Sequence, residues 1–233
     1  MKLFTSWRSS AAWRVRIALN LKTVAYSCEP VHLVRGEQRS AAYQLINPNA
    51  VVPALQLDDG TVLTQSLAII EYLNELHPLP PLLPSDPVLR ARVRAAAQLI
   101  ACDIHPVNNL RVVDHLKSRL GHTSDEATMW MRHWMRAGLE AYLRSIDRTG
   151  DFSFGDTPTL ADLCLVPQLF NARRWGLDFA GLERLADIDS AAATLPAFQA
   201  ATPEAQPEAG PSVLPSQDTA RGTQRPVLSP DPK

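Results

Sequence analysis

Residues 52–66 read Val52-Pro53-Ala54-Leu55-Gln56-Leu57-Asp58-Asp59-Gly60-Thr61-Val62-Leu63-Thr64-Gln65-Ser66, and they carry the clearest fold signal in the chain. Two short apolar runs, residues 52–57 and 61–63, flank Asp59-Gly60, a dipeptide that favours the tight turn of a β-hairpin. Apolar residues then recur with helical spacing from Ser66 to Leu76. The sequence therefore predicts a hairpin that leads directly into a helix.

Upstream of this hairpin, short strand-like runs alternate with helical ones. The runs Leu3–Ser6 and Val31–Leu33 predict strands, and Ala12–Leu21 and Arg39–Ile46 predict helices. Such alternation is typical of βαβ units. We therefore predict an α/β domain over residues 1–80, with the order β-α-β-α-β-β-α.

Downstream, prolines end the last helix of this domain. The run His77-Pro78-Leu79-Pro80-Pro81, with two further prolines close behind, cannot continue a helix and predicts a linker over residues 81–88. Helical periodicity with few strand signals then predicts an all-helical domain over residues 89–200. The predicted helices are Leu89–Leu120, kinked at His105-Pro106, Glu126–Ile146, Leu160–Trp175 and Leu182–Leu195. The proline-rich segment 201–233 has no aromatic residue and is predicted to be disordered.

Composition excludes several classes of protein. With 45% hydrophobic and 20% charged residues and a net charge of -1, the chain resembles neither a nucleic-acid-binding protein nor a membrane-surface protein. No apolar run approaches the length of a membrane span, and no secretory signal is evident. The three cysteines, Cys28, Cys102 and Cys164, are widely spaced and suggest buried or half-buried thiols in a reducing, cytoplasmic setting. The histidine spacing suggests no metal site.

Two adjacent hydroxyls mark the start of the first predicted helix. Ser9 or Ser10 is a natural N-cap. A hydroxyl beside free backbone N–H groups and the positive end of a helix dipole is also well placed to stabilise a thiolate. Both interpretations remain open from these residues alone.

Two further places in the first domain could bind a ligand. If the Val52-Pro53 peptide bond is cis, the backbone of Val52 can pair with an extended peptide; otherwise Pro53 only marks a strand edge. Gln65-Ser66 presents an amide, a hydroxyl and helix N–H groups to an anionic or zwitterionic group, or Ser66 is a simple N-cap.

In the helical domain, Thr159-Leu160-Ala161-Asp162 has the form of a capping box, which we assign to structure. His105, Asn109 and Arg111 lie on nearly one side of the kinked helix. These residues alone indicate a solvated or interdomain face.

The combined order of these motifs resembles the zeta class of glutathione transferases, which includes maleylacetoacetate isomerase and the maleylpyruvate isomerases. The resemblance covers residues 1–205. The motifs that carry it are Ser-Ser-x-x-Trp-Arg-Val-Arg-Ile-Ala-Leu at residues 9–19, Asn47-Pro48, Val52-Pro53-Ala54-Leu55, Gln65-Ser66, Asp103-Ile104-His105-Pro106 and Gly155-Asp156-x-Pro-Thr-Leu-Ala-Asp162. It implies a thioredoxin-like domain followed by an all-helical domain, and a homodimer.

The resemblance also implies a site. Ser9, with Ser10 beside it, would support the thiolate of the cofactor glutathione. The residues implied to bind glutathione are Ser9, Ser10, Gln38, Val52 through its backbone, Gln65, Ser66, His105, Asn109 and Arg111. Arg8 and Arg174 would bind the carboxylates of the acid substrate. Ala11 departs from the family, which typically has cysteine there.

The implied activity is glutathione-dependent cis–trans isomerisation of maleylacetoacetate or maleylpyruvate, in the catabolism of tyrosine and phenylalanine or of aromatic acids. The alternative within enzymes is a transferase that conjugates glutathione to electrophilic or halogenated acids. A non-catalytic binding protein that keeps the fold is a third possibility. No nucleic acid, membrane or metal ion is expected as a partner.

Overall fold

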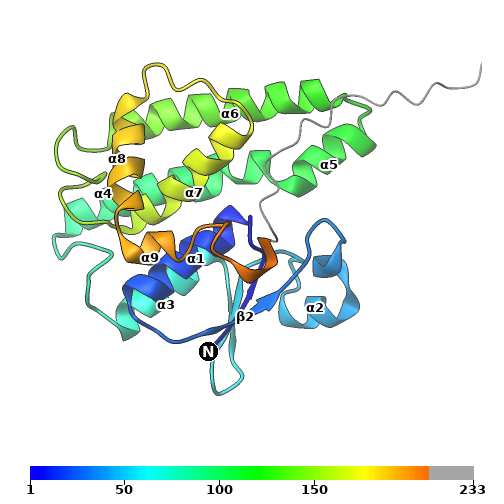
Figure 1. Cartoon of the computed structure of the whole chain (residues 1–233), viewed down its shortest axis with the longest axis horizontal. Helices are drawn as coiled ribbons and strands as arrows, with labels where there is room; N and C mark the ends of the chain where they lie inside the picture. Colours follow the sequence, from blue (N-terminus) through cyan, green and yellow to red (C-terminus); the bar gives the residue numbers. More distant parts are fainter. Residues whose placement is uncertain (210–233) are drawn as a thin grey trace, which may run out of the picture.

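The structure, a computed structural model, describes residues 1–209 (Figure 1). Four short strands form one mixed sheet in the order β2-β1-β3-β4. β1 runs parallel to β2 and antiparallel to β3, and β3 is antiparallel to β4. The strands are β1 (Lys2–Thr5), β2 (Ser27–Pro30), β3 (Ala54–Gln56) and β4 (Val62–Thr64).

Helices cover both faces of this sheet. Alternate residues of a strand point to opposite faces. Leu3 therefore joins the large core beneath α1 (Ser10–Leu21) and α3 (Ser66–Leu76), whereas Phe4 packs in a smaller cluster with Tyr43 of α2 (Ala41–Ile46). The predicted α/β domain and its order of strands and helices are confirmed.

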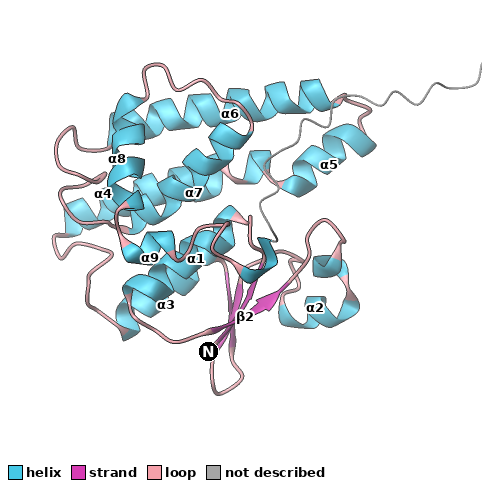
Figure 2. Cartoon of the chain, viewed as in Figure 1, coloured by secondary structure: helices cyan, strands magenta, loops and turns pink. Residues whose placement is uncertain are grey.

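Every longer element after β4 is helical, so the strands lie in one part of the molecule and an all-helical layer covers it (Figure 2). α7 runs through the middle of this layer, and its residues 160–169 are all buried. The helices are α4 (Pro87–Gln98), α5 (Leu110–Ser118), α6 (Ser124–Ser145), α7 (Leu160–Arg174), α8 (Glu183–Ala193) and α9 (Pro196–Gln199). No helix within residues 1–209 has both the length and the apolar composition needed to cross a membrane.

The predicted capping box starts α7. The amide N–H and the hydroxyl of Thr159 both donate to Asp162, at 2.8 Å and 2.9 Å. The fully buried Asp162 carboxylate also accepts the amide N–H of Ser153 at 2.8 Å. This side chain therefore ties the preceding loop to the central helix and serves structure, as predicted.

The predicted strand at Val31–Leu33 is wrong, because β2 lies at Ser27–Pro30. β2 is an edge strand, so it pairs on one side only and tolerates proline and exposed polar residues that hide it from a hydrophobic pattern. Val31 follows the strand. Its N–H donates to the Thr5 carbonyl at 2.7 Å, and its buried side chain packs on the α2 side of the sheet.

The helix predicted over Leu89–Leu120 is divided at the expected place. A π-helical turn, Leu99–Ile104, is followed by a 3-10 turn, Pro106–Asn108, before α5 begins. The N–H of His105 reaches back to the Ile100 carbonyl at 2.9 Å, five residues earlier.

Two predicted boundaries and the predicted burial of one cysteine need correction. α4 begins at Pro87, inside the predicted linker, with Asp86 as its N-cap. The prediction that disorder begins at Ala201 is wrong for residues 201–209, because Ala201 is fully buried and its carbonyl accepts from Arg16 at 3.1 Å. Residues 210–233 of that predicted tail lie outside the described residues. Cys102, predicted to be buried or half-buried, is exposed.

Candidate functional site

A cleft of about 580 Å³ opens where the kinked part of the helical domain meets the first domain. Its walls come from the β1–α1 loop, the segments around residues 32–39 and 50–52, the kink and α5, and the end of α7. These are loops and helix ends, so their polar side chains and free backbone groups face the cleft.

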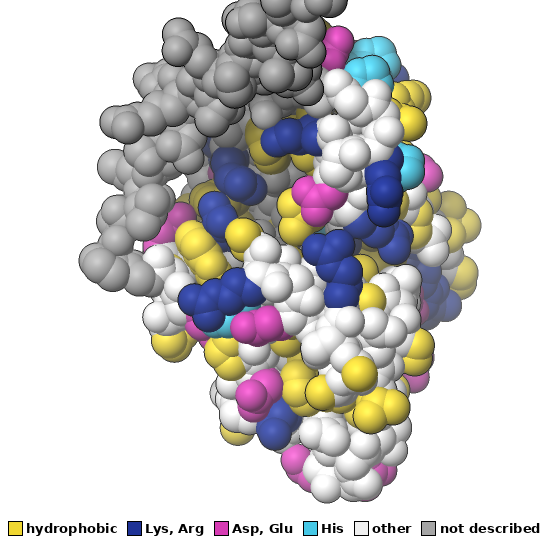
Figure 3. All heavy atoms as spheres, turned by 90° about the vertical axis from the view of Figure 1, so that its right-hand side faces the viewer, with side chains coloured by type: hydrophobic (Ala, Val, Ile, Leu, Met, Phe, Trp, Pro, Cys, Tyr) yellow, Lys and Arg dark blue, Asp and Glu magenta, His cyan; other side chains and the backbone are white. Residues whose placement is uncertain are grey.

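The cleft is strongly cationic. Its basic lining side chains are Arg8, Arg35, Arg39, Arg111, Lys117 and Arg174. Asp114 is the acidic residue among those that line it. None of these basic side chains forms an ion pair within residues 1–209. Lysine and arginine side chains gather on the face of the molecule that carries α2 and α5 (Figure 3), so the site suits a ligand with several negative charges.

Ser9 lies at the start of α1 with its hydroxyl proton free. Its Oγ accepts the N–H of Ala12 at 3.3 Å, which confirms Ser9 as the N-cap. An oxygen that accepts this bond can still donate its proton to a ligand. The buried Ser10 hydroxyl instead donates to the Pro167 carbonyl of α7 at 3.4 Å. The geometry favours Ser9 over Ser10 as the group that meets a ligand atom.

Val52 and Gln38 form another wall. The Val52-Pro53 peptide bond is cis, and β3 begins only at Ala54, so the backbone of Val52 stays outside the strand pairing. The buried Gln38 side chain donates to the Leu33 carbonyl at 3.3 Å. Its amide oxygen is buried with no partner among the described residues. Gln38 therefore keeps an unused acceptor beside the cleft.

Gln65 and Ser66 are not among the residues that line this cleft, but they lie next to its Val52 wall in the sheet. β4 pairs Thr64 with Ala54, so Gln65 follows directly beside Pro53. Gln65 adopts a positive φ of 68° and forms no side-chain bond to the helix, which leaves the first N–H groups of α3 without a side-chain cap. The buried Ser66 hydroxyl accepts from Arg14 at 3.4 Å.

His105, Asn109 and Arg111 all line the helical side of the cleft. Burial, and then the charges of Arg14 and Arg111, lower the pKa of His105 to about 3, so the ring is neutral at physiological pH. The Asn109 amide nitrogen lies 3.3 Å from His105 Nε2 and can only donate. The ring proton therefore sits on Nδ1.

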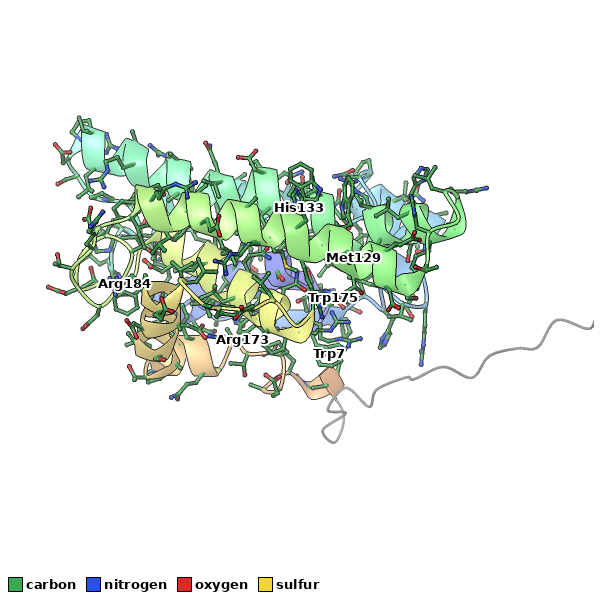
Figure 4. All side chains as sticks on the ribbon, turned by 90° about the horizontal axis from the view of Figure 1, so that it is seen from above. Trp7, Met129, His133, Arg173, Trp175 and Arg184 are labelled. Carbon is green, nitrogen blue, oxygen red and sulfur yellow. The ribbon has the colours of Figure 1, made fainter. Side chains whose placement is uncertain are left out.

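Arg8 and Arg174 form a like-charged pair across the cleft mouth. Burial, and then the charge of Arg8, lower the pKa of Arg174. Each guanidinium stacks on the neighbouring aromatic ring, Arg8 at 4.5 Å from the centre of Trp7 and Arg174 at 5.1 Å from that of Trp175. Both tryptophans line the cleft, and both are labelled in Figure 4. Two cations held this way without a carboxylate partner suit a carboxylate ligand.

Sequence reasoning missed several residues of this site. It did not select Trp7, Trp175, Arg35, Arg39 or Lys117, which line the cleft beside the predicted residues. The adjacency of tryptophan and arginine in Trp7-Arg8 and Arg174-Trp175 was the available signal.

The chain matches two family models of known proteins. Residues 8–76 match the family model described as "Glutathione S-transferase, N-terminal domain", and residues 110–211 match "Glutathione S-transferase, C-terminal domain". The chain belongs to the glutathione S-transferase family. The two matched regions correspond to the α/β domain and to the helical domain of the fold described above.

Similar members of the glutathione S-transferase family are named as isomerases. The maleylacetoacetate isomerase of Pseudomonas aeruginosa is 47% identical over 88% of this chain and 97% of its own length. A holo structure of maleylpyruvate isomerase, described as a bacterial zeta-class glutathione S-transferase, has a TM-score of 0.86 and 45% identity, and the match covers 89% and 99% of the two chains. The resemblance to the zeta class is confirmed.

A further similar structure was solved with ligands bound. The maleylacetoacetate isomerase of Anaeromyxobacter dehalogenans is described with dicarboxyethyl glutathione and citrate bound in the active site. It matches with a TM-score of 0.81 and 45% identity over 90% of this chain and 97% of that chain.

Proposed function

We propose that the protein is a glutathione-dependent cis–trans isomerase that converts maleylacetoacetate to fumarylacetoacetate, or isomerises maleylpyruvate. The observation that carries the proposal is the pairing of two features across one cleft. The free Ser9 hydroxyl at the start of α1 is one, and the arginine pair Arg8 and Arg174 without carboxylate partners is the other.

The groups of the first domain fit glutathione. The free amide oxygen of Gln38 matches a peptide N–H, and the unpaired backbone of Val52 matches an extended peptide. The uncapped start of α3 at Ser66 matches a charged end group. When bound, glutathione supplies a thiolate that adds reversibly to the cis double bond, which permits rotation before the sulfur leaves.

Ser9 would raise the share of the thiolate form. Its hydroxyl proton is free to donate, and it lies at the positive end of the α1 dipole. Both effects stabilise negative charge on sulfur and so lower a thiol pKa. The neutral His105 supplies no proton at physiological pH, and we assign it with Asn109 and Arg111 to the wall that closes over glutathione.

Arg8 and Arg174 would bind the acid. A planar guanidinium holds a carboxylate with two parallel hydrogen bonds, and the stacked tryptophans restrict its orientation. Their charge also stabilises the negative charge that moves onto the conjugated carbonyl group during addition. The citrate and dicarboxyethyl glutathione of the solved relative support an acid-binding cleft of this kind.

The test is an isomerisation assay on the purified protein with its cis acid, with and without glutathione. We expect conversion to the trans acid only with glutathione present, while the total thiol concentration stays constant. A thiol concentration that falls with turnover indicates the alternative, a conjugating transferase. Failure to bind glutathione at all would favour the third possibility, a non-catalytic binding protein with this fold.

We also propose a homodimer that acts in cytoplasmic catabolism of tyrosine and phenylalanine or of other aromatic acids. The resemblance to the zeta class supports the dimer. The three free cysteines, Cys28, Cys102 and Cys164, support a reducing compartment. Light scattering on the purified chain would test the dimer directly.

A further inference from the structure

Two arginines of α1 are buried almost completely but differ in their partners. Arg14 and Arg16 are 1% and 0% exposed. Every nitrogen of the Arg16 guanidinium is hydrogen bonded, with Nε, Nη1 and Nη2 donating to Ala201 O, Thr5 Oγ1 and Trp7 O at 3.1, 3.0 and 3.0 Å. Arg16 therefore holds the β1–α1 loop and the end of the described chain.

Arg14 lacks such partners. Its Nη1 donates to the Ser66 hydroxyl at 3.4 Å, while Nε and Nη2 are buried with no partner within residues 1–209. None of the ion pairs in that part of the chain includes Arg14. Burial raises the pKa of the nearby Cys164 thiol to about 11, so this thiol is no counter-ion. Arginine stays protonated in proteins, and burying an unpaired charge is costly.

Other buried polar atoms nearby differ from this case. The side-chain amides of Asn108 and Gln168 also lack partners among the described residues. Both amides are neutral, and buried water can satisfy them. Arg16 is equally buried and also forms no ion pair within residues 1–209, but neutral oxygens satisfy all of its nitrogens. Arg14 has neither an ion pair nor such oxygen partners for Nε and Nη2, so its guanidinium is the one left to meet an anion.

The place where an anion can meet this charge is the start of α3. Arg14 contacts Ser66, the first residue of that helix, whose N–H groups have no side-chain cap from Gln65. The buried guanidinium and the positive end of the helix dipole therefore favour negative charge at the same point.

We infer that Arg14 is a positioning residue for glutathione: it orients the Ser66 hydroxyl and supplies the buried charge that favours the α-carboxylate of the γ-glutamyl group. The inference rests on the proposed function, because it takes glutathione as the ligand of this site. It also gives the Trp13-Arg14 part of the sequence motif a role in ligand binding that helix packing alone does not require.

The experiment separates the two charges of the γ-glutamyl group. Calorimetry would compare glutathione with 4-aminobutyryl-Cys-Gly, which lacks only the α-carboxylate, and with glutaryl-Cys-Gly, which lacks only the α-ammonium group. In Arg14→Met we expect about tenfold weaker binding of glutathione and of glutaryl-Cys-Gly, the two peptides that carry the carboxylate at the γ-glutamyl end. This matches the loss of a charge-assisted contact. Binding of 4-aminobutyryl-Cys-Gly should change less than about twofold.

Arg16→Met is the matched control, since it removes an equally buried cation two residues away on the same helix. We expect it to lower stability while the ratio of affinities for glutathione and 4-aminobutyryl-Cys-Gly stays at the wild-type value. Arg14→Lys keeps the charge and should keep that ratio within about threefold, which tests the inference even if Arg14→Met does not fold.

The outcomes are distinct. Equal weakening of all three peptides in Arg14→Met, or loss of the carboxylate preference in folded Arg14→Lys, overturns the inference. If the wild-type protein binds none of the three peptides, the proposed function itself fails.

Discussion

Replacing Arg174 by methionine removes one charge of the arginine pair while keeping most of the apolar contact with Trp175. At ion-pair distance and an effective dielectric constant of about 20, one guanidinium attracts a carboxylate by about 4 kcal/mol. Arg174 is partly open to solvent and Arg8 remains, so the net loss should be nearer to that of a charge-assisted hydrogen bond, about 1.5–3 kcal/mol. This corresponds to a KM for the dicarboxylic acid that rises roughly 10–150-fold.

Steady-state kinetics with the acid and glutathione varied separately would measure this. The KM for glutathione should stay within about twofold, because its proposed groups lie on the first domain and on the kink. Arg173→Met is the control: Arg173 occupies the same helical turn but pairs with Asp189 and stacks on Phe179, and we expect it to change neither constant. A comparable rise in the KM for glutathione in Arg174→Met would refute the assignment of Arg174 to the acid.

Further predictions concern the fold and the cleft. Asp162→Ala should lower the free energy of unfolding by about 2–4 kcal/mol in denaturant titrations, because it removes the cap at Thr159 and leaves buried donors unpaired. His105, with a folded pKa of about 3 against about 6.5 unfolded, contributes stability that is present above pH 6.5 and lost as the pH falls. Between pH 6 and 4, the free energy of unfolding of the wild type should therefore fall by up to about 1.4 kcal/mol per pH unit more than that of His105→Gln. An equal dependence of unfolding free energy on pH in the two proteins would contradict the low pKa of His105. Trp7→Leu should raise the KM for the acid roughly two- to fivefold through the lost stacking on Arg8, with glutathione binding unchanged.

The sequence predicted those parts of the fold that local chemistry dictates. Asp59-Gly60 gives the hairpin, the hydroxyl of Ser9 caps α1, and proline at position 106 breaks the long helix. β2 was misplaced because an edge strand is stabilised by its pairing with β1 rather than by its own side chains.

The site was predictable only in part for a similar reason. Ser9 and Arg8 lie next to recognisable signals in the chain, but their pairing with Arg174 depends on how two domains meet. The different roles of Arg14 and Arg16 were equally hidden, since both occupy the same buried helix and differ only in distant partners such as Ser66 and Ala201. Tertiary contacts of this kind leave no periodic trace in a sequence.

The proposed function depends on Ser9, which would hold the sulfur of bound glutathione as a thiolate. The most direct test is the pKa of the bound thiol, measured from the ultraviolet absorbance of the thiolate as the pH is varied in wild type and in Ser9→Ala. We expect the wild-type protein to lower this pKa well below that of free glutathione, and Ser9→Ala to return it most of the way while still binding glutathione. An equally low thiol pKa in Ser9→Ala would show that the Ser9 hydroxyl does not stabilise the thiolate.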